Sequence, residues 1–163
     1  MAALKALYES LGFTGVATYI QSGNVVFKSN KSDPRAVGAD IARSIEKKFG
    51  FTVTVIIRDP KSMASIIKKN PFVGRRGLDE KRLHVTFLQE KPAPALVRTL
   101  APLTSKTNDE YEVKGTEIYL HCPNGYGTTF LSNTFFEKNL KVAATTRNWN
   151  TVEVLCGMAS GDS

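Results

Sequence analysis

Short apolar and polar stretches alternate along this chain, and their spacing predicts small helices and strands. In the first half, apolar residues recur at helical spacing in Ala3–Leu11 and Pro34–Phe49. Two β-rich runs, Val16–Ile20 and Asn24–Lys28, flank a Ser-Gly pair and predict a hairpin. A continuous β-branched run, Phe51–Ile57, predicts a further strand.

The second half contains a similar series after a helix that begins at Asp59-Pro60 and must end before Pro71. A loop rich in Gly and Arg covers 72–81. The remaining pattern predicts a strand at 83–88, a helix at 93–100, a hairpin of strands at 111–113 and 117–122, a helix after Ser132, and a last helix that contains Trp149, Val152, Leu155, Cys156 and Ala159.

Capping residues mark several of these helix ends. Asp33 and Ser132 each stand directly before a helical pattern, and Gly50 follows one. For the last helix, the polar run before Trp149 offers Thr145 or Thr146 as the capping oxygen.

The order of elements predicts an α+β protein. Its second half reads β-α-β-β-α, and its first half reads the same without the opening strand. We therefore expect a tandem of two ferredoxin-like, split β-α-β units, of which the first lacks its opening strand. The expected divisions are a first unit over 1–71, a loop over 72–81, and a second unit over 82–160 with an extra C-terminal helix.

Composition narrows the class of protein. The 163 residues are 42% hydrophobic and 23% charged, as in an ordinary globular protein. No apolar run approaches the roughly 20 residues that span a bilayer, so no membrane association is expected. Cys122 and Cys156 fit no metal or disulfide pattern, which indicates reduced thiols and a cytoplasmic location. No cofactor motif is present, and the oligomeric state stays open.

The formal net charge of +7 favours anionic partners. Cations concentrate around the central loop, where Lys68, Lys69, Arg75 and Arg76 form a candidate nucleic-acid-binding surface. Phosphate contacts need only such charges. A solvated helix end and loop would have the same composition, so this alternative stays open.

Three phrases carry a family resemblance: residues 18–27, 135–138 and 144–152. They resemble the bacterial family catalogued as domain of unknown function 1697, and the resemblance runs from Met1 to about Ala159. It implies an α+β fold of duplicated ferredoxin-like units. It implies no established activity, so no catalytic residue is carried over. Family members usually begin with a strand and a Gly-containing loop that this sequence lacks, and a truncated or misplaced start is the simplest explanation.

The polar run ahead of the last helix is the first candidate ligand site. Thr146, Arg147, Asn148 and Asn150 combine amides, a hydroxyl and a guanidinium at a helix start, where backbone N–H groups attract anions. The alternative is a capped helix docked by Trp149, with Arg147 paired to a carboxylate.

The turn at Gln21, Ser22 and Asn24 is the second candidate ligand site. Its amides and hydroxyl suit a ligand amide or a phosphate. Turn chemistry alone also explains these residue types around Gly23.

The Gly-rich loop at 125–129 lacks the Gly-Lys-Ser/Thr ending of a phosphate-binding loop. Strand parity places His84 and Thr86 on one sheet face with Tyr119 and His121, and assigns the opposite face to the core, namely Leu83, Val85, Phe87, Ile118, Leu120 and Cys122. No metal-ligand spacing and no catalytic motif is present.

The resulting hypothesis is a binding module for a phosphate-bearing partner such as nucleic acid. Two alternatives stay open: an enzyme that acts on a small nucleotide-like or phosphorylated compound, and a protein-interaction scaffold with an exposed sheet edge. Whether the protein is an enzyme is uncertain from the sequence.

Overall fold

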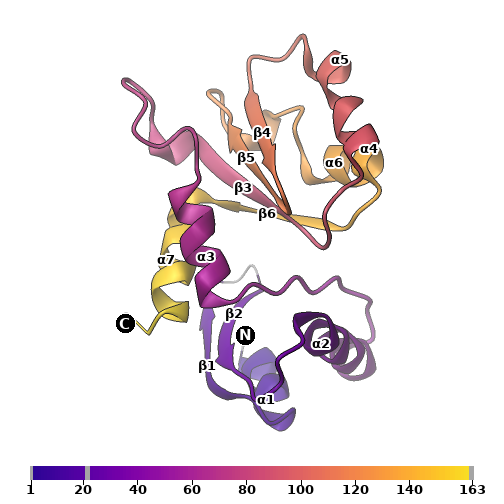
Figure 1. Cartoon of the computed structure of the whole chain (residues 1–163). Coiled ribbons are helices and arrows are strands. Elements are labelled where there is room, and N and C mark those ends of the chain that lie inside the picture. The colour runs from indigo at the N-terminus through magenta and orange to yellow at the C-terminus, as the bar shows by residue number, and fades with distance from the viewer. Residues whose placement is uncertain (1, 21–22, 162–163) are drawn as a thin grey trace. The chain divides into compact units, whose positions relative to one another are not determined.

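The computed structural model describes residues 2–20 and 23–161 (Figure 1). It has a mixed α+β fold with two antiparallel sheets, one of two strands and one of four. The chain divides into unit 1, which holds residues 1–63 and 154–163, and unit 2, which holds residues 64–153. The division falls within a helix, so the loop at 72–81 belongs to unit 2.

Unit 1 contains the hairpin that the sequence predicts. Its elements are α1 (Ala2–Ser10), β1 (Thr14–Tyr19), β2 (Asn24–Lys28), α2 (Pro34–Phe49) and the start of α3 (Pro60–Lys68). The Asp33 side chain accepts a hydrogen bond from the Arg35 N–H, and α2 ends at Gly50 with φ 80°. The Asp33 bond confirms the predicted start of the helix. The positive φ of Gly50, which suits glycine, confirms its predicted end.

Aromatic rings form the centre of the unit 1 core. The Phe27 ring of β2 lies 4.6 Å from the Phe13 ring and 5.2 Å from the Tyr8 ring, measured between centroids. Ile41 of α2 is fully buried beside them. Burial raises the pKa of Tyr8 to about 12, so its hydroxyl stays protonated at neutral pH.

The prediction of a strand at Phe51–Ile57 is wrong as far as the described residues show. The segment follows α2 without joining either sheet. Val53, Val55 and Ile57 nonetheless pack against the unit 1 core. The β-branched composition therefore reports alternate burial correctly, but a strand also needs a neighbour to supply ladder hydrogen bonds.

Unit 2 is built on the four-stranded sheet. Its elements are the end of α3, then β3 (Leu83–Leu88), α4 (Pro94–Arg98), α5 (Leu100–Thr104), β4 (Glu110–Lys114), β5 (Glu117–His121), α6 (Asn133–Leu140), β6 (Ala144–Asn148) and the start of α7 (Trp149–Ala159). The strand order is β4-β5-β3-β6, and every neighbouring pair is antiparallel. The Ser132 hydroxyl accepts from the Phe135 N–H, which confirms the predicted cap of α6.

Strand β6 was missed by the sequence reading, which treated this run as a polar helix entrance. It pairs with β3 from His84↔Asn148 to Leu88↔Ala144. Polar side chains conceal the strand because four of its five residues are Thr, Arg or Asn, types that also occur at helix starts. The pairing partner lies about 60 residues away in sequence, so no local pattern reveals it.

The face assignment of β3 and β5 was also wrong. His84 lies opposite Leu120 and Val85 lies opposite Tyr119, so the opposed residues share a face. His84 and Thr86 therefore stand on the face of Leu120, whereas Tyr119 stands on the face of Val85. Both faces are apolar and covered, since Val85, Thr86 and Leu120 are all fully buried.

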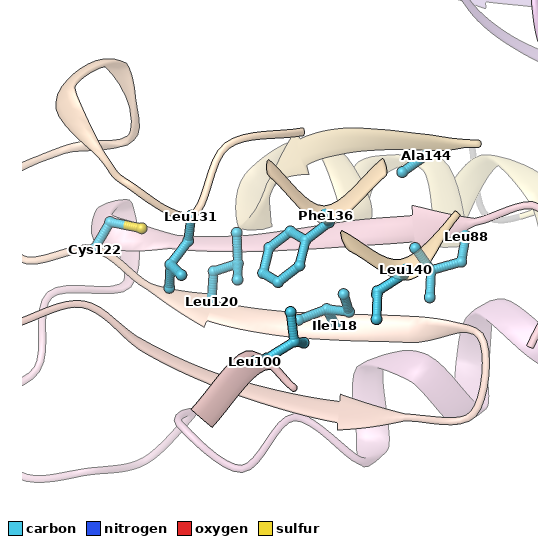
Figure 2. Packing of buried hydrophobic residues seen from close by; sticks show 9 residues of the cluster. All are labelled: Leu88, Leu100, Ile118, Leu120, Cys122, Leu131, Phe136, Leu140 and Ala144. Atoms are coloured by element: carbon cyan, nitrogen blue, oxygen red, sulfur yellow. The ribbon is translucent and has the colours of Figure 1, made fainter. Parts of the chain in front are cut away.

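One core of unit 2 lies between this sheet and the helices α5 and α6. Figure 2 shows Phe136 and Leu140 of α6 pointing toward Ile118 and Leu120 of β5, with Leu100 of α5 beside them. All five side chains are almost fully buried. This core fixes the sheet on which the candidate site residues stand.

Among the helices within 2–20 and 23–161, none is long and apolar enough to cross a membrane.

Candidate functional site

The pleat of β6 divides the polar run that the sequence singled out. Thr146 lies opposite Thr86 and Asn148 lies opposite His84, which places both on the sheet face covered by α6. Arg147 lies opposite Val85 and therefore points to the other face. The structure thus brings Thr146 and Asn148 to one side and separates Arg147 from them.

Thr146 belongs to a hydrogen-bond network on the α6 side. Its hydroxyl lies 2.8 Å from the Thr86 hydroxyl and donates to Asn133 Oδ1 at 3.0 Å. Asn133 Nδ2 in turn donates to the Ala144 carbonyl at 2.7 Å. The Thr146 hydroxyl is therefore engaged within the fold, where it connects β3, β6 and the start of α6.

Asn148 caps the last helix. Its Oδ1 accepts a hydrogen bond of 2.8 Å from the Thr151 N–H, at the third position of α7. The prediction that Thr145 or Thr146 supplies this cap is wrong, because both residues are inside β6. Asn148 and Asn150 are exposed, so their remaining polar atoms reach the surface.

The Arg147 guanidinium is held along its own strand. Nη1 donates to the Thr145 hydroxyl at 2.6 Å and to the Thr146 carbonyl at 2.9 Å. Burial lowers the pKa of Arg147 from its ordinary value. An arginine nevertheless stays charged at neutral pH, so a partly buried cation stands on this face of the sheet.

His84, like Thr86, is a residue that sequence reasoning placed on the wrong face. Its Nδ1 is buried and has no hydrogen-bond partner among the described residues. The ring stacks on Tyr126 with centroids 4.8 Å apart, and the Tyr126 hydroxyl accepts from the Asn133 N–H at 3.1 Å. Burial lowers the pKa of His84. A hydrogen bond with the backbone of Arg82 raises it by a smaller amount. The ring is therefore neutral at pH 7.

The second candidate, the turn in unit 1, is described only in part. Gln21 and Ser22 lie outside the described residues. Asn24 is buried, and its Nδ2 donates to the Tyr19 carbonyl at 3.2 Å across the hairpin. Gly23 has φ 79°, as a tight turn requires. This bond matches the turn alternative for Asn24, and a ligand role for the three residues stays a prediction.

Lys68 and Lys69 stand at the end of α3, Arg76 stands in the loop that follows, and Lys114 stands on β4; we call these four cations of unit 2 the cationic surface. Lys114 comes from the edge strand β4, and its Nζ donates to the Lys69 carbonyl at 2.9 Å. Lys68, Lys69 and Arg76 are exposed, and none has an ion pair within the described part of the chain. The sequence named three of these residues but missed Lys114, which only the fold brings close.

Arg75 differs from its neighbours because it is paired. Its Nη1 lies 3.0 Å and 2.9 Å from the two Glu110 carboxylate oxygens, and its guanidinium stacks 4.7 Å from the Phe72 ring centroid. His121 Nδ1 lies 3.0 Å from Glu110 Oε1. Hydrogen bonds first from His121 and then from Arg75 hold the pKa of Glu110 below its ordinary value. Arg75 thus fastens the loop to β4.

Unit 1 has an open cleft of about 350 Å³ that the sequence reading did not identify. Asp40 pairs there with Lys31 at 2.7 Å and with Arg43. The hydrogen bond from Lys31 is the main cause that lowers the pKa of Asp40. The lining residues are Leu11, Phe13, Lys31, Asp40, Arg43, Ser44 and Lys47. Asp40, Arg43, Ser44 and Lys47 lie three or four residues apart along α2. This spacing was the signal in the sequence, because residues three and four apart share a helix face.

Groups that could hold a metal are not evident in the described ranges. No cluster of three or more His, Cys, Asp or Glu side chains is suitably placed there. Cys122 is fully buried and donates to the Thr129 hydroxyl at 3.5 Å, and burial raises its pKa. A thiol of this kind behaves as a small core residue.

Comparison with known proteins places this fold among relatives. Residues 1–119 match the family described as protein of unknown function DUF1697. The chain belongs to this family. No curated protein matches the sequence. A solved structure of the conserved bacterial protein SP0830 from Streptococcus pneumoniae is similar in fold, with a TM-score of 0.69 and 18% identity; the match covers 98% of this chain and 88% of that one.

The DUF1697 match covers some of the candidate site residues and leaves out others. Residues 1–119 include the whole cationic surface, His84 and Asn24. The strand β6 and the cap of α7 lie beyond the matched range. The family description names no activity, so function has to be argued from these side chains.

Proposed function

We propose that this member of the DUF1697 family binds a phosphate-bearing polymer, such as nucleic acid, through the cationic surface. The observation that carries the proposal is the hydrogen bond from Lys114 Nζ to the Lys69 carbonyl. It brings an edge-strand lysine to Lys69. Lys68 and the loop residue Arg76 are exposed, and none of these four cations has an ion pair among the described residues. A polymer of phosphates fits such a group because each cation can neutralise one backbone charge.

Arg75 has a positioning role in this proposal. Its two-fold contact with Glu110 and its stacking on Phe72 fasten the loop that carries Arg76. A loop fixed in this way presents its cation with less entropy to lose on binding. The proposed contacts reach phosphate and sugar only, so they predict affinity with little sequence preference.

The test is fluorescence anisotropy with a labelled 20-nucleotide DNA, single-stranded and duplex, between 50 and 200 mM salt. The variant carries Lys68→Ala, Lys69→Ala and Arg76→Ala. For the duplex, the slope of log K against log salt should become shallower by about 0.9 for each phosphate contact removed. A matched control replaces three exposed cations of α1 and α2, namely Lys5, Arg35 and Lys48, by Ala.

The control variant loses the same net charge but keeps the cationic surface. Equal losses in the two variants would show that net charge alone attracts DNA. Absence of binding at 50 mM salt by the unaltered protein would overturn the proposal outright. The proposed role of the cationic surface survives only if its variant loses more affinity than the control variant.

A small phosphorylated or nucleotide-like compound is the second candidate ligand. The unpartnered Nδ1 of His84 favours it, because a buried polar atom without a partner costs free energy that a ligand could recover. Asn148 lies opposite His84 in the sheet and reaches the surface. Titration of isotope-labelled protein with AMP should shift the His84 ring resonances, and unchanged resonances at millimolar AMP would exclude this site.

We also propose that the two units form a tandem of ferredoxin-like units. The support in unit 2 is the series β3, α4–α5, β4, β5, α6, β6 with strand order β4-β5-β3-β6. Unit 1 has the same series from its first helix to residue 57, without a counterpart of β3.

A cytoplasmic location is proposed on the two unbonded cysteines, since disulfides are rare in that compartment.

A further inference from the structure

The open cleft of unit 1 joins an apolar floor to a cationic rim. Leu11 follows α1 and Phe13 precedes β1, and the two residues form the floor. Phe13 is buried, with its ring against Tyr8 and Phe27 of the unit 1 core, and Leu11 is half-buried. Because the core holds Phe13 in place, the floor is a fixed apolar surface. An apolar group bound on it would be removed from water.

Asp40 holds two of the three cations that line the cleft. Its Oδ2 accepts from Lys31 Nζ at 2.7 Å, and its Oδ1 accepts from Arg43 Nη2. The hydrogen bond from Lys31 keeps the pKa of Asp40 below its ordinary value, so the carboxylate is ionised at neutral pH. Both of its oxygens are thus engaged. Asp40 fixes the positions of Lys31 and Arg43 and offsets one of the three positive charges, the third being that of Lys47.

One turn of α2 presents three kinds of hydrogen-bond donor at the rim. Lys47 lies three residues after Ser44 and four after Arg43, so the three side chains share one side of the helix. Arg43 uses only Nη2 toward Asp40, and a guanidinium has five N–H donors. Within residues 2–20 and 23–161, the Lys47 ammonium has no ion pair and the Ser44 hydroxyl has no hydrogen bond. This turn can therefore donate to an anion.

We propose that this cleft binds a small organic carboxylate, with its apolar body on Leu11 and Phe13 and its carboxylate between Arg43 and Lys47. The inference goes beyond the proposed function, because every lining residue belongs to unit 1 and none belongs to the cationic surface. A volume of about 350 Å³ is at the lower end of the range for ligand pockets, which suits a compound with one ring. An inorganic anion would leave the floor uncovered, and an uncharged apolar compound would leave the donors of α2 without an acceptor.

Titration of the isotope-labelled full chain with phenylacetate, followed by two-dimensional amide NMR, tests the proposal. The amides of 11–13 and 40–47 should shift, with a dissociation constant on the order of 1 mM for a ligand of this size. Phenylethanol lacks the charge, and acetate lacks the ring. Each should bind about tenfold more weakly than phenylacetate, because each loses one of the two kinds of contact.

Lys47→Ala should weaken phenylacetate binding about fivefold, as expected for the loss of one exposed ion pair. Lys48→Ala is the matched control, since it removes the same charge from the next position of α2, outside the lining residues, and should leave the affinity unchanged.

Ser44→Leu fills the cleft without a change of charge and should abolish binding. Both lysines are exposed, so their variants keep the fold even if Ser44→Leu does not. Equal weakening by Lys47→Ala and Lys48→Ala, or acetate binding as tight as that of phenylacetate, would show a general attraction of anions and would overturn the proposal. Unchanged amides at ten times the expected dissociation constant would also overturn it.

Discussion

The Tyr119 hydroxyl donates a buried hydrogen bond of 2.7 Å to the Ile66 carbonyl. This bond joins β5 to the last turn of α3 across 53 residues of sequence. Burial raises the pKa of Tyr119, so the phenol keeps the proton that it donates. The contact orients the helix end from which Lys68 and Lys69 extend.

Tyr119→Phe should therefore destabilise the protein by about 1–2 kcal/mol, because the Ile66 carbonyl stays buried and loses its donor. Urea unfolding followed by far-UV circular dichroism measures the loss. Tyr111→Phe is the matched control, since the Tyr111 hydroxyl has only a 3.3 Å contact with Thr104. A loss in Tyr119→Phe no larger than in Tyr111→Phe would contradict the assignment.

Asn148→Ala should cost about 1 kcal/mol of unfolding free energy, because it removes the cap of α7. Asn148→Asp keeps the accepting oxygen and should retain stability. Thermal unfolding of both variants checks this. Asn150→Ala changes an exposed neighbour and should have almost no effect. If Asn148→Asp were as unstable as Asn148→Ala, the capping oxygen would not be the reason.

Acid should weaken unit 2 through Glu110. Its pKa is lowered in the folded state, so the stabilisation from its pairing with His121 and Arg75 is present above the ordinary carboxyl pKa, about 4.3. It is lost as pH falls through the lower folded value. Glu110→Gln should make the urea midpoint less sensitive to pH between about 5 and 3. Glu112→Gln, on the same strand, should keep the full sensitivity.

His84 should add a second loss of stability at higher pH. Burial lowers its folded pKa, so the unfolded chain takes up the proton first once pH falls below about 6.5. Stability then declines with falling pH until the folded ring protonates. His84→Phe keeps the stacking on Tyr126 and should flatten the dependence between pH 7 and 5. Equal slopes for the two proteins by urea unfolding would refute this role.

Local signals were enough to predict much of this fold. Asp33, Gly50 and Ser132 act within one turn of their own helix, so each helix end could be read from the sequence. The α+β class follows from the same short periodic segments. The hairpin β1–β2 is likewise local, since its two strands are close in sequence.

The parts that depend on distant pairing could not be predicted. The face of His84 depends on its register with Leu120, and a shift of one residue reverses it. Arg147 and Asn148 were grouped as one site because they adjoin in sequence, but their strand directs them to opposite faces. Lys114 was overlooked because only the folded sheet brings it to Lys69.

The chain order of the two units has a consequence for synthesis on the ribosome. Unit 2 is one continuous segment, 64–153, whereas unit 1 is completed only by residues 154–163. Unit 2 starts later in the sequence than unit 1. All of its residues nevertheless leave the ribosome before those of unit 1 are complete. Nascent chains commonly fold from the amino terminus onward. Here the segment 64–153 can form its sheet while residues 1–63 still lack residues 154–163 of their unit.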